Sequence, residues 1–117
     1  MEREKDIEAR VKKGIEDAGG LFFKFTSPGN DGVPDRIAVL PGRTVYVELK
    51  TKTGKLSKLQ RYQIGRLLKL RQQVCVVRGM EAAECFIFDM RAGLLNSIDY
   101  RGPDKWKALE AEGGDDL

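Results

Sequence analysis

Apolar residues recur along the chain at two spacings, and these spacings predict helices alternating with strands. Ile7, Val11 and Ile15 repeat at helical spacing, which predicts a helix over residues 4–18. The Gly-Gly pair at 19–20 is a typical stop signal and ends this helix. The chain is therefore expected to open with an amphipathic helix that packs one side against a core.

Four apolar segments after this helix are predicted as strands. The first covers 21–25 and is followed by a loop rich in Pro, Gly, Asn and Asp over 26–34. The segments 35–40 and 45–51 are predicted to pair antiparallel, because only the turn sequence Pro-Gly-Arg-Thr separates them. The apolar segment 73–79 is predicted as a central strand of the sheet.

A second helix is predicted to begin with a capping box. The Ser57 hydroxyl can accept from the backbone N–H of Gln60, whose side chain can reach back to the backbone of Ser57. The helix is expected to run to about Gln72. Residues 80–92 are predicted as a third helix, with a strand over Cys-Phe-Ile-Phe-Asp-Met as the alternative.

After Leu95 the pattern weakens, and a short terminal helix is predicted over 104–111. This order of elements predicts a single α/β domain over 1–117, with a mixed sheet flanked by helices.

The strand over 45–51 carries charges inside an apolar run. Because strand side chains alternate between faces, Glu48 and Lys50 point the same way, and Val47 and Leu49 point the other way. One reading is a surface ion pair on the solvent-facing side of the strand. The other is a chemical site, which depends on what lies nearby.

Composition limits the chemistry that is available. The chain has 117 residues, no histidine and two cysteines in apolar settings, which favours free thiols in the cytoplasm over a disulfide. No apolar run is long enough to span a membrane, and the charged N-terminus lacks the apolar segment of a signal peptide. Without imidazole, hydrolysis would depend on carboxylates, lysine and a hard metal ion.

The net charge of +3 is unevenly distributed. Residues 50–78 hold nine basic residues and no acid, whereas the last eight residues, 110–117, are acidic. This asymmetry indicates a polyanionic partner that binds away from the tail. Four of these basic residues are predicted to bind phosphates: Lys52, Lys55, Lys58 and Arg61. The alternative is that they are ordinary surface charges.

A carboxylate pair is expected where the two central strands meet. The short hairpin lets Asp35 approach Glu48, and paired carboxylates repel each other unless a cation lies between them. Mg²⁺ or Mn²⁺ suits such oxygen ligands and can activate a water molecule. Lys50, one strand period after Glu48, can offset charge that develops during the reaction.

The pattern Pro34-Asp35, then Glu48-Leu49-Lys50, resembles the PD-(D/E)xK nuclease superfamily. The longer sequence 32–60, with Gly-Val-Pro-Asp-Arg, Val-Glu-Leu-Lys-Thr and Gly-Lys-Leu-Ser, resembles the VRR-NUC nucleases more specifically. Val-Val-Arg-Gly at 76–79 is similar to a later motif of that family. The resemblance covers about residues 4–80 and leaves 81–117 without an assigned role.

This resemblance implies a restriction-endonuclease-like core and roles for individual residues. Asp35, Glu48, the Leu49 carbonyl and Glu8 would be metal ligands, and Lys50 would be the catalytic lysine. Glu8 could instead be a solvated helix residue.

Gln60 matches a glutamine that this family places beside the site. The capping box explains the same residue equally well, and both roles are compatible.

The resemblance implies a Mg²⁺- or Mn²⁺-dependent endonuclease acting on DNA. A homodimer that cuts four-way (Holliday) junctions is expected, because symmetrical cutting requires two active sites. A non-catalytic DNA-binding module and a flap or duplex nuclease are the alternatives. The chain has more apolar residues in this region than one sheet face needs, so some of them are candidates for a subunit contact: Phe86, Ile87, Phe88, Leu94, Leu95 and Ile98.

Overall fold

The computed structural model describes residues 2–111, so the predicted acidic tail lies largely outside the described residues. The described residues form three helices and six strands. In order they are α1 (Glu4–Asp17), β1 (Leu21–Lys24), β2 (Arg36–Leu40), β3 (Arg43–Lys50), α2 (Lys58–Lys69), β4 (Gln73–Arg78), α3 (Gly79–Arg91), β5 (Ile98–Gly102) and β6 (Lys105–Ala108).

The strands form one mixed sheet in the order β1-β2-β3-β4-β5-β6. The pairs β1–β2, β2–β3 and β5–β6 are antiparallel, whereas β3–β4 and β4–β5 are parallel. Helices α2 and α3 are the crossovers between the parallel strands, as parallel pairing requires. The carboxyl ends of β3, β4 and β5 therefore lie at the same edge of the sheet.

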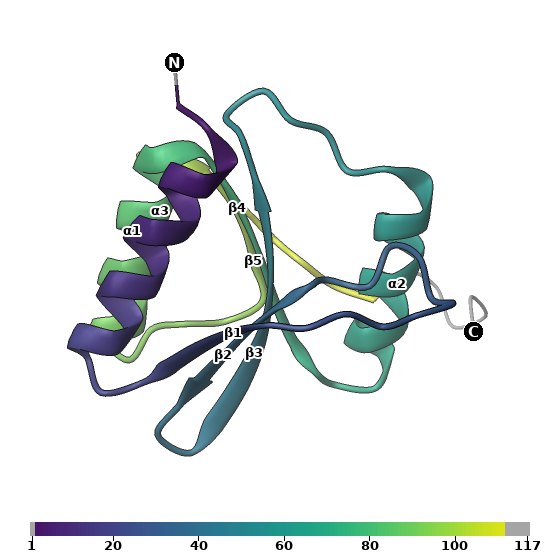
Figure 1. The fold of residues 1–117 in the computed structure, drawn as a ribbon, viewed down its shortest axis with the longest axis horizontal. Coiled ribbons are helices and arrows are strands. Elements are labelled where there is room, and N and C mark those ends of the chain that lie inside the picture. The colour runs from purple at the N-terminus through teal and green to yellow at the C-terminus, as the bar shows by residue number, and fades with distance from the viewer. Residues whose placement is uncertain (1, 112–117) are drawn as a thin grey trace.

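The sheet lies between two helical layers, with α1 and α3 on one face and α2 on the other (Figure 1). The larger core fills the α1/α3 side and includes Ile7, Val47 and Phe86, all fully buried. A smaller core beneath α2 is built around Ile64, Val74 and Val76. The sheet face under α2 is therefore less completely covered by apolar side chains, which leaves room for polar groups.

Most sequence predictions for the first 92 residues are confirmed. The helix over 4–18, the β2–β3 hairpin and the central strand over 73–79 are all present, within a residue or two. The helix predicted over 80–92 is α3, so the alternative strand there was wrong. Both cysteines are free thiols, as expected. In the described part of the chain, no helix has the length and apolar character needed to cross a membrane.

The short terminal helix predicted over 104–111 was wrong. Lys105–Ala108 is instead the edge strand β6, which pairs antiparallel with β5. The sequence Gly-Pro-Asp makes the connecting turn, with Gly102 and Asp104 at positive φ. Residues 105–108 form a strand because they make backbone hydrogen bonds to the open edge of β5. A short exposed helix in the same place would be less stable.

Most of the six candidate residues for a subunit contact belong to the core. Phe86, Ile87 and Leu95 are at most 6% exposed, and Ile98 packs against the same core. The number of apolar residues exceeded the expected core because β5 was not predicted. Its pairing with β4 adds a strand for α3 to cover. Of this set, only Phe88 and Leu94 are largely exposed.

Candidate active site

The predicted carboxylate pair meets where the β2–β3 ladder ends. The last pair of that ladder is Arg36 with Val47. One further step in the same register places Asp35 opposite Glu48, on the face that α2 covers. Beyond Val47, β3 continues beside β4 only. The β3 backbone at Glu48–Lys50 therefore has no pairing partner in β2. It lies at the end of the ladder, close to Asp35.

Glu48 is a nearly buried carboxylate, with only 7% of its surface exposed. Gln60 Nε2 donates to Glu48 Oε2 at 3.3 Å, and Lys50 Nζ lies 4.0 Å from the same oxygen. Burial raises the pKa of Glu48 to about 7, against the opposing charge of Lys50 and with a further rise caused by Asp35. The pocket thus concentrates negative charge that the protein only partly neutralises.

Gln60 forms the predicted capping box and also contacts Glu48. Its backbone N–H donates to Ser57 Oγ at 3.1 Å, and its side-chain Oε1 accepts from the Ser57 backbone at 2.9 Å. The same side chain uses its Nε2 on Glu48. Gln60 therefore connects the first turn of α2 to the Glu48 carboxylate. The capping box holds the Gln60 side chain in the orientation that this contact needs.

Arg36 connects the other two acids. Its guanidinium contacts Asp35 Oδ1 at 2.8 Å and also pairs with the Glu8 carboxylate from α1. Only 9% of the Arg36 side chain is exposed, whereas 51% of the Asp35 side chain is exposed. Glu8 therefore reaches the site through Arg36, and its carboxylate is directed to that guanidinium.

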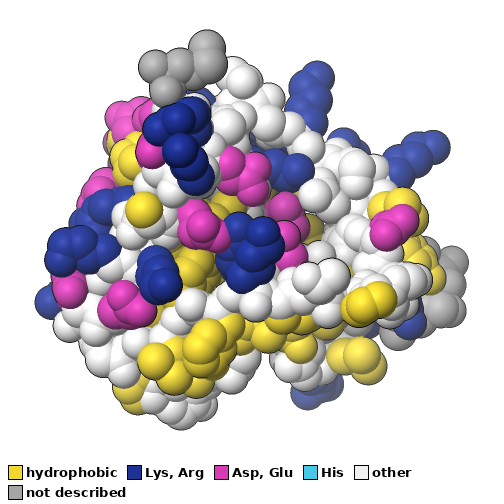
Figure 2. Space-filling view, in the orientation of Figure 1, with side chains coloured by type: hydrophobic (Ala, Val, Ile, Leu, Met, Phe, Trp, Pro, Cys, Tyr) yellow, Lys and Arg dark blue, Asp and Glu magenta, His cyan; other side chains and the backbone are white. Residues whose placement is uncertain are grey.

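Acidic and basic side chains lie together in the middle of the molecular face between α1 and α2 (Figure 2). Glu4, in the first turn of α1, is close enough for its charge to raise the pKa of Glu48 further. Glu4 lies one helical turn before Glu8, so both acids project from the same side of α1.

The oxygen-rich donor set fits a hard divalent cation. The pKa of Glu48 is raised chiefly by burial, and the charges of Asp35 and Glu4 raise it further. A bound cation would favour the ionised carboxylate and so lower this pKa. Among residues 2–111, no cluster of three or more acidic or thiol side chains has metal-binding geometry. Asp35 and Glu48 could hold an ion such as Mg²⁺, which is often bound by one or two carboxylates and keeps several waters.

The four predicted phosphate-binding residues divide into two groups. Lys52 is 70% exposed and lies 3.7 Å from Glu81, on the α3 side of its loop. Lys55, Lys58 and Arg61 line a groove beside α2. Only the latter three therefore face a concave surface.

Sequence reasoning did not assign a function to Arg36, although the residue stands in the Pro-Asp-Arg motif. The available signal was its position: Arg36 and Ala38 share the inward face of β2, where an unpaired arginine would be costly. An arginine on the inward face, directly after a candidate ligand, indicates acidic partners nearby.

Glu48 should make the metal-free protein pH-sensitive. Its pKa is raised from 4.5 to about 7 on folding. The folded state therefore holds this proton more tightly, and the free energy of unfolding should fall as pH rises from about 4.5 to 7. The expected loss is on the order of 3 kcal/mol, and E48Q should remove it.

Urea unfolding in EDTA at pH 5 and pH 8 measures this difference, with E48Q as the matched comparison. An equal pH dependence in both proteins would contradict the assigned environment of Glu48.

Comparisons with known proteins agree with the geometry of the site. The chain is 40% identical over 76 residues to "Putative nuclease p44" of Acyrthosiphon pisum secondary endosymbiont phage 1, covering 64% of this chain and 82% of that protein. A solved structure described as a VRR_NUC domain superimposes with a TM-score of 0.68 and 29% identity, covering 73% of this chain and 94% of that one.

A search of family models gave no match. The identity to the phage protein extends over most of its length, and the structural match covers nearly all of the solved domain. The mixed six-stranded sheet with its three helices agrees with the same restriction-endonuclease-like core. The chain therefore belongs to the VRR-NUC family of nucleases.

Proposed function

We propose that this nuclease is a divalent-metal-dependent endonuclease that hydrolyses DNA phosphodiester bonds at Asp35, Glu48 and Lys50. The observation that carries the proposal is the nearly buried Glu48 carboxylate, which has Lys50 Nζ at 4.0 Å and whose pKa is raised in part by the charge of Asp35. A surface ion pair would not need this burial, nor the contact that Gln60 makes to the same carboxylate.

Asp35 and Glu48 would hold Mg²⁺ or Mn²⁺, with the Leu49 carbonyl as a third oxygen donor. When bound, such an ion supplies Lewis-acid activation of water and neutralises charge on the phosphate. Glu8 contributes by orienting Arg36, which in turn contacts Asp35. Gln60 keeps the Glu48 carboxylate aimed at the site.

Lys50 would orient the attacking water and offset the negative charge that develops on the phosphate oxygens. The water oxygen forms a bond to phosphorus as the bond from phosphorus to the 3′ oxygen breaks. The attacking water gives up a proton to solvent, and the leaving 3′ oxygen takes up a proton from solvent. The products are a 5′-phosphate and a 3′-hydroxyl. Lys50 is 19% exposed on its side chain, so its ammonium is held close to the reacting groups.

The proposed substrate is a four-way junction cut by a homodimer. Two equivalent strands of a junction require two equivalent sites, which a two-fold dimer supplies. Phe88 and Leu94, 67% and 63% exposed, are the apolar residues of the predicted contact that remain free for this role. They flank the carboxyl end of α3.

The test compares cleavage of a four-way junction with cleavage of linear duplex, in Mg²⁺, in Mn²⁺ and in EDTA. Light scattering on the same sample gives the mass in solution. We expect metal-dependent cleavage, a preference for the junction and the mass of a dimer. Cleavage in EDTA would contradict the metal proposal, and a dimer that cuts duplex equally well would contradict the junction proposal.

A further inference from the structure

A basic groove lies between α2 and the β4–β6 part of the sheet, outside the carboxylate site. It has a volume of about 850 Å³ and is lined by eight basic and two acidic side chains. Lys55, Lys58 and Arg61 stand on the α2 side, and Arg78 and Arg101 stand on the sheet side. This excess of positive charge in a concave surface favours a polyanionic ligand.

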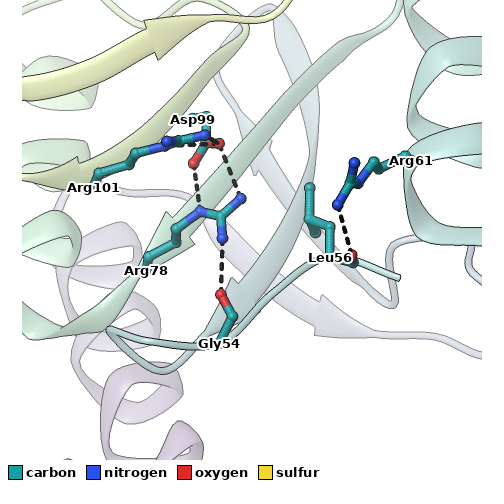
Figure 3. A network of polar contacts seen from close by, with 6 residues as sticks. All are labelled: Gly54, Leu56, Arg61, Arg78, Asp99 and Arg101. Atoms are coloured by element: carbon teal, nitrogen blue, oxygen red, sulfur yellow. Dashed lines mark hydrogen bonds and ion pairs between the residues drawn. The ribbon is translucent and has the colours of Figure 1, made fainter. Parts of the chain in front are cut away.

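The sheet wall of the groove begins beside the catalytic lysine. Lys50 and Arg78 are register partners on adjacent parallel strands, so their side chains share one face. Arg78 and Arg101 both pair with Asp99, and Arg61 approaches from across the opening (Figure 3). One wall of the groove therefore lies on the strand next to the one that carries Lys50.

Asp99 fixes the two arginines in advance of any ligand. Its carboxylate is 2% exposed and accepts from Arg78 at 2.8 and 3.0 Å and from Arg101 at 2.9 Å. Arg78 also donates to the Gly54 carbonyl at 2.8 Å, which ties the loop after Lys50 to the sheet. Two guanidiniums share one carboxylate, so the cluster keeps a net positive charge held in fixed geometry.

Two further features of the lining suit a nucleic-acid strand. The Lys69 ammonium is buried and has no hydrogen-bond partner among the described residues, so one cation of the wall lacks a counter-charge. Tyr62 is 50% exposed and carries the Arg66 guanidinium 5.5 Å from its ring centroid. An exposed ring with an adjacent guanidinium is a typical surface for base stacking.

We infer that this groove binds one or two unpaired nucleotides at the branch point of the DNA substrate, beside the cleavage position. A cavity of this size is comparable to sites that hold one small-molecule ligand, so it admits one or two nucleotides and excludes a duplex. Cations along the walls contact successive phosphates, and Tyr62 stacks on a base. The claim that the bound nucleotides lie beside the cleavage position rests on the proposed nuclease site. The claim that the groove binds them does not.

The test measures binding without cleavage. Fluorescence anisotropy in EDTA follows a labelled oligothymidine of about ten nucleotides and a blunt duplex of equal length, each over a range of salt. The double variant R101A/K107A removes two charges from the sheet wall. It should weaken single-strand binding about tenfold and reduce the salt slope by about 1.4, with less than about a twofold change for duplex.

The matched control K12A/R91A also removes one lysine and one arginine. Both residues are exposed on α1 and α3, on the opposite face of the sheet. This control should bind the single strand like the wild type. If R101A/K107A is destabilised by the loss of the contact between Arg101 and Asp99, K107Q is the second variant. It removes the charge of one exposed groove residue, places no new carboxylate opposite Asp99, and should weaken single-strand binding by about as much as one lost charge.

Equal losses for single strand and duplex would overturn the inference, as would a loss no greater than that of K12A/R91A. Because EDTA prevents metal-dependent cleavage, a negative binding result leaves the proposed nuclease site standing. Conversely, a failure of metal-dependent cleavage would leave a positive binding result intact.

Discussion

Replacing Lys50 with alanine is expected to lower the DNA cleavage rate at least about a thousandfold, with DNA affinity changed by less than about threefold. The ammonium lies 4.0 Å from Glu48, at the centre of the proposed site. It would stabilise charge that develops only in the transition state, so its loss should reduce turnover. DNA affinity depends on many other cations, because residues 50–78 alone contain nine.

Single-turnover cleavage and anisotropy in EDTA measure these two effects separately. K12A, which removes one exposed lysine on α1, is the matched control and should cut at the wild-type rate. A purified K50A protein that is folded, yet cuts at a rate near that of the wild type, would show that Lys50 has no catalytic function.

The substitutions D35N and E48Q are each expected to reduce cleavage by at least about a hundredfold. Both keep the size of the side chain and remove one negative charge from the proposed metal ligands. E48Q should also make the metal-free protein more stable at pH 8, because it removes a carboxylate that is buried at a cost. A loss of activity with a gain in stability would separate a functional residue from a structural one.

D31N provides the control for the carboxylate substitutions. Asp31 is an exposed acid in the loop before β2, and its side chain has no ion pair among the described residues. It should cut normally. Wild-type rates in both D35N and E48Q would remove the basis for a carboxylate site.

The sequence predicted the part of the fold that is specified by local patterns. The β2–β3 hairpin follows from two apolar runs separated by a short turn, and its register brings Asp35 opposite Glu48. Alternation along β3 predicted that Glu48 and Lys50 would share a face. The capping box predicted both the start of α2 and the orientation of Gln60.

The remaining features depend on contacts between distant segments. Glu8 pairs with Arg36 because α1 packs over β2, and no local pattern reports this packing. The strands β5 and β6 were missed because their short sequences take their structure from pairing with the sheet.

Only one wall of the basic groove could be predicted from the sequence, for the same reason. Its α2 wall is a cluster of cations in sequence, but Arg101 and Lys107 join it through the topology of the sheet. The burial of Asp99, which holds Arg78 and Arg101, likewise follows from tertiary packing.

Calorimetric titration of Mn²⁺ into the metal-free protein tests the central claim most directly, because it examines the carboxylate pair without depending on the DNA substrate. The wild type should bind Mn²⁺, and D35N and E48Q should each weaken this binding at least about tenfold, since each removes one of the few charged ligands. D31N should bind like the wild type. Unchanged Mn²⁺ affinity in both D35N and E48Q would contradict the assignment of Asp35 and Glu48 as one metal site.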